Sequence, residues 1–499
     1  MDLAAPDRSG RVTAPDQQAG RPGRLPGRRP GGLPAAASSW WLALAAAAFT
    51  AAQLAFVVPH LGLSWDETVY LSQVSGHAPA AYFDAARARG IPLLVAPVAA
   101  VTSSVTAVHV DLALASGAAM FLALAVWRPL RPGWQLALAA LTFGGLWVTQ
   151  YYGPQAMPDL WVAFAAVAAT GFLLRWAGRP QPGRAGLPAL AGLAASAGAA
   201  ALIRPGDAVF LAAALAAAII AVPWWRRWPP LAAVTAGLVA GSAEWVIEAY
   251  ARFGGPLARL HAASGEQGGI GLHAGWWAEL RAVSGPTLCR PCTAGWRAPE
   301  LSIWWLVLPL AVAAGIWAAR RGGRGASAAL AAWCALALAA QYLFLVGYAA
   351  PRFLLPGYAL ASIPVADAAG WLATGLAPRW RQVAAAVIGV VLAGQLVSQH
   401  LILTHEVRGT VAFHQDYARI AADLRALGLR PPCVLKGQQF IPIAFAAGCA
   451  SAGPADDARR AAVLAYPAAR PPRYARHWRR YRLPGTRLLR VVAYLPRRG

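Results

Sequence analysis

Two adjacent carboxylates, Asp66 and Glu67, lie in the stretch GLSWDETVYLS (residues 62–72), shortly after a long apolar run that ends at Val58. A carboxylate can accept the proton of a hydroxyl group while that hydroxyl attacks an electrophilic carbon. Charged groups at membrane depth are costly and usually mark function where they face a cavity. Asp66 and Glu67 are therefore the first candidates for a catalytic site.

A second set of charges could bind an anion. Arg204 lies in RPGD with Asp207, and Arg352 lies in YAAPRFLLPGYAL. A guanidinium offers two parallel N–H donors to a phosphate. Pro351 disfavours helix for the residue before it, so a helix should begin near Arg352 and add the partial positive charge of its N-terminus. Arg352 is the first candidate for a phosphate ligand and Arg204 the second; the alternative is that Arg352 only reaches lipid headgroups.

Three further acidic positions stand near the ends of apolar runs. Asp159 lies in YYGPQAMPDL, and Glu244 and Glu248 are one helical turn apart. The glutamate pair could coordinate a divalent cation such as Mg²⁺ or Mn²⁺, or it could pair with nearby arginines. Asp84, in AAYFDAARARG, is expected on an amphipathic helix at the membrane surface, where it should be dispensable. Each of these acids could also be a solvated group that only anchors a helix end.

The elements that must position these residues are membrane helices. With 58% hydrophobic and 13% charged residues over 499 positions and a mean hydropathy of +0.46, the chain is too apolar for one soluble core. Apolar runs long enough to cross a ~30 Å hydrocarbon layer recur along it. We predict an all-α polytopic protein with about eleven transmembrane helices, over residues 39–58, 108–127, 134–150, 159–176, 187–203, 208–224, 231–250, 301–319, 326–346, 353–372 and 382–402.

Arginine indicates the orientation of these spans. If residues 1–38 are cytoplasmic, the basic loops near 128–131, 175–184, 226–227, 320–324 and 379–381 are cytoplasmic too, as the positive-inside rule requires. This holds only if the short apolar segment 91–107, broken by Pro92 and Pro97, does not span. The candidate acids and Arg352 then all face the exterior.

The net charge of +24 does not indicate a nucleic-acid partner, because the arginines are divided among short loops and the two ends of the chain. Anionic lipid headgroups fit this distribution better. Residues 1–38, rich in Pro, Gly, Ala and Arg, should form a disordered cytoplasmic tail. This tail is not a signal peptide, because its first apolar run begins near residue 39 and is of full length.

Residues 403–499 change in character and should form a small exterior α/β domain. The stretch PPCVLKGQQFIPIAFAAGCAS predicts strand, helix and strand, and AAVLAY and LLRVVAYLP predict two more strands. Because the exterior is oxidising, Cys433 and Cys449 are candidates for a disulfide, with two buried thiols as the alternative. Together with residues 1–38 and the membrane region 39–402, this domain completes the predicted organisation.

Three cysteines lie outside this domain. In the exterior loop 251–300, Cys289 and Cys292 form a CxxC pair that a local disulfide explains best, since the spacing to His261 and His273 matches no standard zinc site. Cys334, in the middle of a predicted span, should be a small buried apolar residue.

Three motifs, namely the DE after the first span, the MPD at the third exit and RFLLPGYA entering a late span, together resemble motifs of the GT-C membrane glycosyltransferases. The likeness is greatest to the protein O-mannosyltransferase and lipid A aminoarabinose transferase branch. The resemblance covers residues 39 to about 402. It implies a multi-helix bundle with an exterior cavity and a donor sugar on a polyprenyl phosphate. It also implies that Asp66 is the catalytic base, while Glu67 and Asp159 support the acceptor or a metal.

We therefore predict an inverting transferase that moves one sugar from a polyprenyl monophosphate to an exterior glycan, lipid or protein. No general acid is needed, because the leaving group is already a phosphate. The alternatives are a transporter or lipid flippase, a polysaccharide polymerase or ligase with a diphosphate-linked donor, and a scaffold. The position of the largest cavity separates transfer from transport: an exterior cavity favours transfer, and a continuous or midplane site favours transport.

Overall fold

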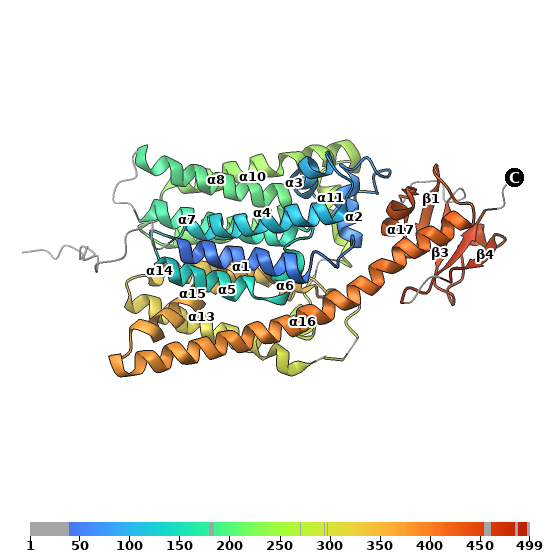
Figure 1. Ribbon diagram of the computed structural model, residues 1–499. Coiled ribbons are helices and arrows are strands. Elements are labelled where there is room, and N and C mark those ends of the chain that lie inside the picture. Colours follow the sequence, from blue (N-terminus) through green and yellow to red (C-terminus); the bar gives the residue numbers. More distant parts are fainter. Residues whose placement is uncertain are drawn as a thin grey trace, which may run out of the picture.

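The computed structural model describes residues 39–496 except 179–183, 270, 294, 297, 454–460 and 485–487. The predicted tail 1–38 lies outside these described residues. Long helices form one bundle whose axes run roughly side by side, and a small sheet domain stands beyond one end of it (Figure 1). This confirms the predicted fold class.

Each predicted span coincides with helix. The bundle helices are α1 (Trp40–Phe56), α4 (Val105–Ala125), α5 (Gly133–Gly144), α6 (Trp147–Tyr152), α7 (Pro158–Ala177), α8 (Leu187–Ile203), α9 (Pro205–Ala221), α10 (Trp228–Glu248), α13 (Ile303–Arg321), α14 (Gly325–Phe344), α15 (Leu355–Thr374) and α16 (Pro378–Ala426). Among the described residues, seven helical segments are long and apolar enough to cross a membrane by themselves, and α1, α8 and α9 are shorter apolar helices. The chain is therefore a multi-pass membrane protein.

The predicted span 134–150 is not one helix. It breaks after Gly144 because Gly145 follows directly, and two consecutive glycines hold a helix weakly. The break leaves backbone groups that other side chains satisfy. The Nε2 of Gln150 donates to the Gly144 carbonyl at 2.7 Å, and the backbone N–H of Trp147 donates to Oε1 of Gln399 on α16 at 3.0 Å. The break thus turns α6 toward the end of the bundle that carries the domain.

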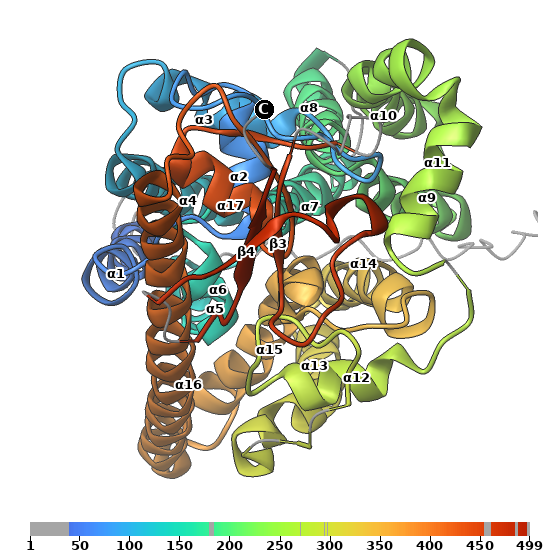
Figure 2. The same ribbon diagram turned by 90° about the vertical axis from the view of Figure 1, so that its right-hand side faces the viewer.

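Short elements cover that same end (Figure 2). They are α2 (Trp65–Ser72), α3 (Gly90–Ala99), the π-helix η2 (Ala249–Phe253), α11 (Pro256–Glu266), α12 (Gly275–Ala282) and the 3-10 turns η3 (Pro299–Ser302) and η4 (Pro351–Leu354). Helix α3 is only ten residues long and is followed by a turn before α4, which agrees with a non-spanning segment at 91–107. The helix expected around Asp84 does not form: residues 81–88 are irregular, with a turn at 85–86.

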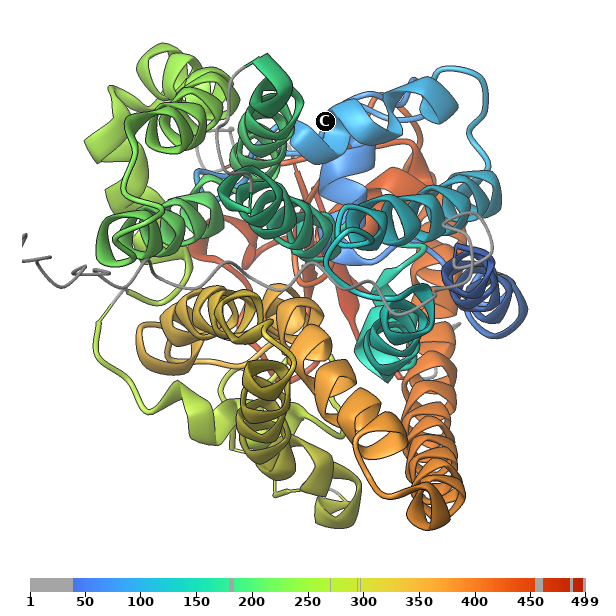
Figure 3. The ribbon, with the colours of Figure 1, turned by 90° about the vertical axis from the view of Figure 1, so that its left-hand side faces the viewer.

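The opposite end of the bundle contains the connections α4–α5, α9–α10 and α13–α14, and the 3-10 turn η1 (Arg184–Gly186) precedes α8 there (Figure 3). Between α8 and α10 the two backbones touch. A Cβ at Gly241 would lie 2.1 Å from the carbonyl oxygen of Gly198, and one at Gly237 would lie 2.2 Å from that of Ala194. Small residues at such crossings let membrane helices approach closely.

The C-terminal domain is a five-stranded sheet of order β2-β1-β3-β5-β4. Its strands are β1 (Val434–Gly437), β2 (Ala450–Ser451), β3 (Ala462–Ala465), β4 (Arg479–Arg482) and β5 (Val492–Leu495), with α17 (Phe440–Ala447) between β1 and β2 and the turn η6 (Arg473–Ala475) after β3. Strand β1 is parallel to β2 and β3, while β5 is antiparallel to β3 and β4. The arginine-rich β4 was not predicted.

Helix α16 joins the bundle to this domain without a break. The boundary predicted at residue 402 falls inside this helix of 49 residues, whose last turns enter the core of the domain through Ile420 and Leu424. A disulfide joins Cys433 to Cys449, so the start of β1 is tied to the start of β2. Cys334 is buried in α14 as a free thiol.

Candidate active site

Asp66 lies in the first turn of α2, and a capping box starts this helix. The backbone N–H of Glu67 donates to Oγ of Ser64 at 3.4 Å, and the backbone N–H of Ser64 donates to Oε2 of Glu67 at 3.0 Å. Such reciprocal bonds satisfy N–H groups that a helix start leaves free. The box fixes the direction of α2, and with it the position of Asp66.

Glu67 differs from its prediction as a group that supports the acceptor or a metal. Its side chain is fully buried, and its Oε1 lies 3.0 Å from Nε2 of His109 on α4 and 3.1 Å from the backbone N–H of Ala156. Burial raises the pKa of Glu67, but the His109 ring and these N–H groups outweigh it and lower the pKa below its usual value. Glu67 therefore fastens α2 to the bundle and does not face a cavity.

Asp66 is held between two guanidiniums. Its Oδ1 lies 2.7 Å from Nη2 of Arg87, and its Oδ2 lies 3.0 Å from Nη2 of Arg352. Burial raises the pKa of Asp66, but these two cations outweigh it and bring the pKa to about 2. While both ion pairs are intact, the carboxylate is a weak base.

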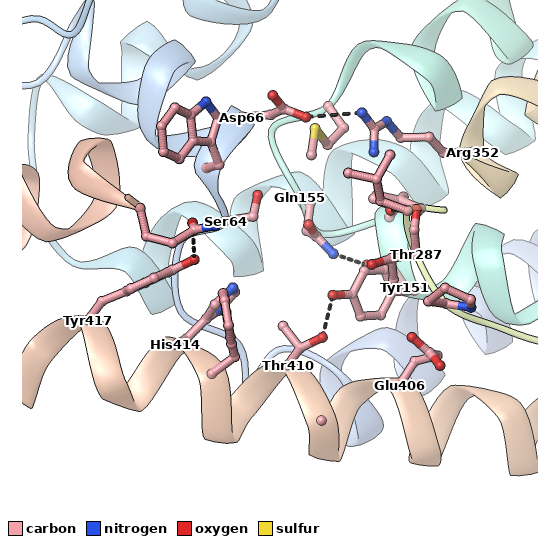
Figure 4. A pocket seen from close by; sticks show the side chains of 18 of the residues that line it. Ser64, Asp66, Tyr151, Gln155, Thr287, Arg352, Glu406, Thr410, His414 and Tyr417 are labelled. Carbon is pink, nitrogen blue, oxygen red and sulfur yellow. Dashed lines mark hydrogen bonds and ion pairs between the residues drawn. The ribbon is translucent and has the colours of Figure 1, made fainter. Parts of the chain in front are cut away.

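Arg352 connects Asp66 to a second carboxylate (Figure 4 shows the Asp66 contact). Its Nε lies 3.3 Å from Oδ2 of Asp159, whose other oxygen is paired with Arg204. Asp159 is buried at the start of α7, and Arg204 is the residue between α8 and α9. The structure thus brings four predicted site residues, Asp66, Asp159, Arg204 and Arg352, into one chain of ion pairs.

Arg87 completes this chain and was not predicted. Its Nε lies 2.6 Å from Asp84, which is itself in the irregular segment before α3. The pairing places Asp84 beside the site, whereas the sequence had suggested a dispensable surface group. Only the alternation of charges in FDAARARG could have signalled Arg87.

Glu244 and Glu248 had two predicted roles, binding a divalent cation or pairing with arginines. In the structure they lie beside arginines. Glu248 accepts from Arg89 at 2.5 Å, from Arg252 at 2.9 Å and from Arg259 at 2.9 Å. Glu244 lies 3.9 Å from Arg89. Across the described part of the chain, no three His, Cys, Asp or Glu residues gather as a metal site would require. This also applies to His261 and His273, predicted as the weaker zinc alternative.

The turn that carries Arg352 is held by the loop before α13. The backbone N–H of Cys289 donates to the Ala349 carbonyl at 2.9 Å, and a disulfide closes Cys289 onto Cys292. The backbone N–H of Ala350 donates to Oε1 of Glu279 at 3.1 Å. Glu279, which was not predicted, is fully buried, and burial raises its pKa to about 8.

Two cavities meet at Asp66 and Arg352. The first, of about 370 Å³, is the arginine cavity; Arg87, Arg204, Arg290 and Arg352 line it, with Asp84 and Glu266. The second, of about 430 Å³, is the aromatic cavity; Trp65, Tyr151, Tyr152, Phe413 and Tyr417 line it, with one face of α16. Both are also lined by Trp65, Met157 and Leu288.

The face of α16 in the aromatic cavity was not predicted. Glu406, Thr410, His414 and Tyr417 project from it toward Asp66 and α6 (Figure 4). Their spacing of four, four and three residues puts them on one side of a helix. This polar and aromatic spacing, just past the apolar part of α16, was a signal in the sequence.

The fold of the chain is similar to the folds of two solved membrane-enzyme structures. It matches the crystal structure of ArnT from Cupriavidus metallidurans bound to undecaprenyl phosphate with a TM-score of 0.61 and 14% identity, over 91% of this chain and 97% of that one. It matches the oligosaccharyltransferase AglB from Archaeoglobus fulgidus, in complex with an inhibitory peptide and a dolichol-phosphate, with a TM-score of 0.52 and 12% identity, over 86% of this chain and 69% of that one. No protein-family model and no curated protein matches the sequence.

Proposed function

We propose that the protein is an inverting membrane glycosyltransferase that moves a single sugar from a polyprenyl monophosphate to an acceptor hydroxyl on the exterior face of the membrane. One observation carries this proposal: Asp66 stands where an arginine-lined cavity meets an aromatic one. A transferase of this kind needs an anion site, a hydroxyl site and a base between them. The fold is shared with proteins whose structures were solved with undecaprenyl phosphate and with a dolichol-phosphate, which supports the lipid donor.

The arginine cavity is the proposed site of the donor phosphate. Arg352 and Arg204 were the predicted phosphate ligands, and Arg87 and Arg290 join them there. Guanidiniums bind phosphate oxygens through paired N–H donors, and they neutralise the charge that grows on a departing phosphate. Asp159 positions Arg204 and Arg352 through its ion pairs with both.

The reaction needs one base and a stabilised leaving group. The acceptor oxygen forms a bond to the anomeric carbon, its proton moves to the Asp66 carboxylate, and the bond between the anomeric carbon and the phosphate oxygen breaks. Polyprenyl monophosphate leaves with the bonding electron pair. In the proposed arrangement, the acceptor in the aromatic cavity attacks the face of the sugar opposite its phosphate in the arginine cavity, and this inverts the configuration.

Donor binding should also prepare the base. A phosphate in the arginine cavity would compete with Asp66 for Arg87 and Arg352, the two cations that pair with it and lower its pKa most. As these contacts weaken, the pKa of Asp66 rises toward its ordinary value. The donor would therefore bind before Asp66 can take a proton.

The orientation is part of the proposal. The arginine-rich connections near 128–131, 226–227 and 320–324 lie at the end of the bundle away from the C-terminal domain (Figure 1). With these loops cytoplasmic, the domain and both cavities face the exterior. Both cavities lie at the end of the bundle that carries the domain, which favours transfer over a transporter or flippase. We keep a monophosphate-linked donor as the proposal. The alternative is the diphosphate-linked donor of a polymerase or ligase.

The test replaces the base. In a strain that lacks the gene, an Asp66→Asn copy should not restore the missing envelope glycan. In detergent, release of polyprenyl monophosphate from the labelled donor in the presence of an envelope acceptor fraction should fall by ~10²–10⁴. Donor binding should persist. Glu300→Gln, an exposed acid in η3, is the matched control. Turnover of Asp66→Asn close to that of the wild type would remove Asp66 from this role.

A further inference from the structure

The aromatic cavity is built between the bundle and the helix that leads to the C-terminal domain. Seven of its lining residues belong to α16: His405, Glu406, Gly409, Thr410, Phe413, His414 and Tyr417. Opposite them stands α6, where the hydroxyl groups of Tyr151 and Thr410 lie 2.8 Å apart. The Tyr417 hydroxyl donates to Oε1 of Gln439, the residue before α17, at 3.0 Å. The cavity therefore has walls from both parts of the molecule.

Its lining combines ring surfaces with uncharged hydrogen-bonding groups. Trp65, Tyr151, Tyr152, Phe413 and Tyr417 supply the rings. Ser64, Gln155, Thr287, Thr410 and Gln439 supply hydroxyls and amides that can both donate and accept. A sugar has the matching surface, because its ring presents C–H groups on its faces and hydroxyls around its edge. Such pairing of apolar faces with a few placed polar groups is how small ligands are oriented.

The charges of the two cavities differ. Of the arginines and lysines that the structure describes, only Arg352 lines the aromatic cavity, and it is already paired with Asp66 and Asp159. Two carboxylates, Asp66 and Glu406, line the same space. An acceptor that carries phosphate groups would meet these acids with no further cation to balance it, whereas four arginines line the neighbouring cavity.

A peptide acceptor also fits poorly. One common way to hold an extended peptide is to pair its backbone with the edge of a sheet. Among the described residues that line the aromatic cavity, none belongs to a strand, and most of the wall is helix side chains.

We propose that the aromatic cavity binds the acceptor and that this acceptor is the uncharged, hydroxyl-rich end of a glycan. The inference rests on the proposed function and deepens it by naming the acceptor class. Glu406, His405 and the tyrosines would orient the terminal sugar so that one hydroxyl points to Asp66.

The test measures binding to the full-length protein in nanodiscs loaded with polyprenyl monophosphate. The probes are a neutral hexose tetrasaccharide, a neutral pentose tetrasaccharide, the hexose tetrasaccharide with a terminal phosphate, and a Ser/Thr-rich octapeptide. Saturation-transfer NMR should show binding of at least one neutral tetrasaccharide. Phe413→Ala and Tyr417→Ala should each weaken it by about tenfold or more. Tyr417→Phe, which keeps the ring, should lose less, and Tyr250→Ala, an exposed tyrosine in η2, should bind as the wild type does.

The outcomes separate this inference from the function on which it rests. Binding of only the phosphorylated probe or only the peptide, or of neither neutral tetrasaccharide, overturns the glycan assignment. The assignment is also overturned if a neutral tetrasaccharide binds the Phe413→Ala and Tyr417→Ala variants as well as it binds the wild type. If the protein melts at the same temperature in nanodiscs with and without polyprenyl monophosphate, the proposed function itself is overturned.

Discussion

The side chain of Arg352 contacts two carboxylates at once. It contacts Asp66 through Nη2 and Asp159 through Nε, and it borders both cavities. The guanidinium plane makes this possible, because its donors point in fixed and different directions. An ammonium group is a single point charge, so it cannot hold two carboxylates and a phosphate in the same arrangement.

Substitution of Arg352 should separate charge from geometry. Arg352→Lys should weaken transfer, and Arg352→Ala should lower turnover further, by about 10²–10³, the usual effect of removing one group that stabilises developing charge. A donor-binding assay measures the loss of donor affinity, and release of polyprenyl monophosphate measures the loss of turnover. Arg320→Ala, at the opposite end of the bundle, is the control. If Arg352→Ala bound donor and turned over normally, Arg204 would be the next candidate for the phosphate.

The buried carboxyl of Glu279 should make the stability of the protein depend on pH. It is buried beside the turn that carries Arg352, and its carboxyl has a pKa of about 8 where 4.5 is ordinary. Between these two values the folded protein keeps a proton that the unfolded chain releases. The free energy of unfolding therefore decreases as the pH rises through this range, by about 1.4 kcal/mol for each unit of pKa difference.

Glu279→Gln should remove this pH dependence. The variant cannot ionise, so its melting temperature relative to that of the wild type should rise steadily between about pH 5 and about pH 8. Melting curves of both proteins across this range measure the difference, and Glu300→Gln should run parallel to the wild type. Parallel curves for Glu279→Gln would show that the carboxyl titrates normally in the folded protein.

At the scale of elements, the sequence predicted what periodicity and apolar length determine. The spans, the short segment 91–107 and most strands follow from local composition. The division of α5 from α6 depends on a distant partner, Gln399, and the course of α16 past residue 402 depends on the core of another domain. Neither contact leaves a local pattern.

In the candidate site too, local sequence predicted some features, and others depend on distant contacts. Asp66, Asp159 and Arg352 could be predicted because each lies at the end of an apolar run. Their association could not, because the contact between Arg352 and Asp66 joins residues 286 positions apart. Glu67 was assigned to the same site as its neighbour, yet successive residues of a helix point in different directions, and only Asp66 reaches the cavities.

The register of α16 should decide acceptor use. Each added residue turns the following part of a helix by about 100°. One alanine inserted between Leu403 and Thr404 would rotate the seven lining residues away from α6 and should abolish transfer, while donor binding persists. The control is one alanine inserted after Ala468, in the exposed stretch after β3. Normal transfer by the α16 insertion would exclude this face from the acceptor site. Label transferred to the acceptor fraction and donor binding measure the two effects.

At the scale of the whole molecule, the bundle and the domain act as one body because one helix belongs to both. Helix α16 has 49 residues, roughly 74 Å at ~1.5 Å per residue, whereas about 20 residues cross a membrane. The face that lines the aromatic cavity begins three residues after the predicted end of the span, at His405. Trp65 of α2 and Phe440 of α17 also meet, with ring centroids 5.4 Å apart, above this cavity.

Because α16 holds the domain beside this end of the bundle, we expect access to Asp66 to depend on the width of the acceptor. A slender chain end should enter beneath the domain, whereas a folded protein should not approach the same depth unless the domain moves. Transfer to a glycan end should therefore be insensitive to the size of whatever is attached at the far end of that glycan. A long acceptor carrying a bulky fluorophore at its distal terminus should react as fast as the unlabelled one, whereas the same fluorophore near the reacting end should stop the reaction. Equal rates for both placements would mean that the entrance is open.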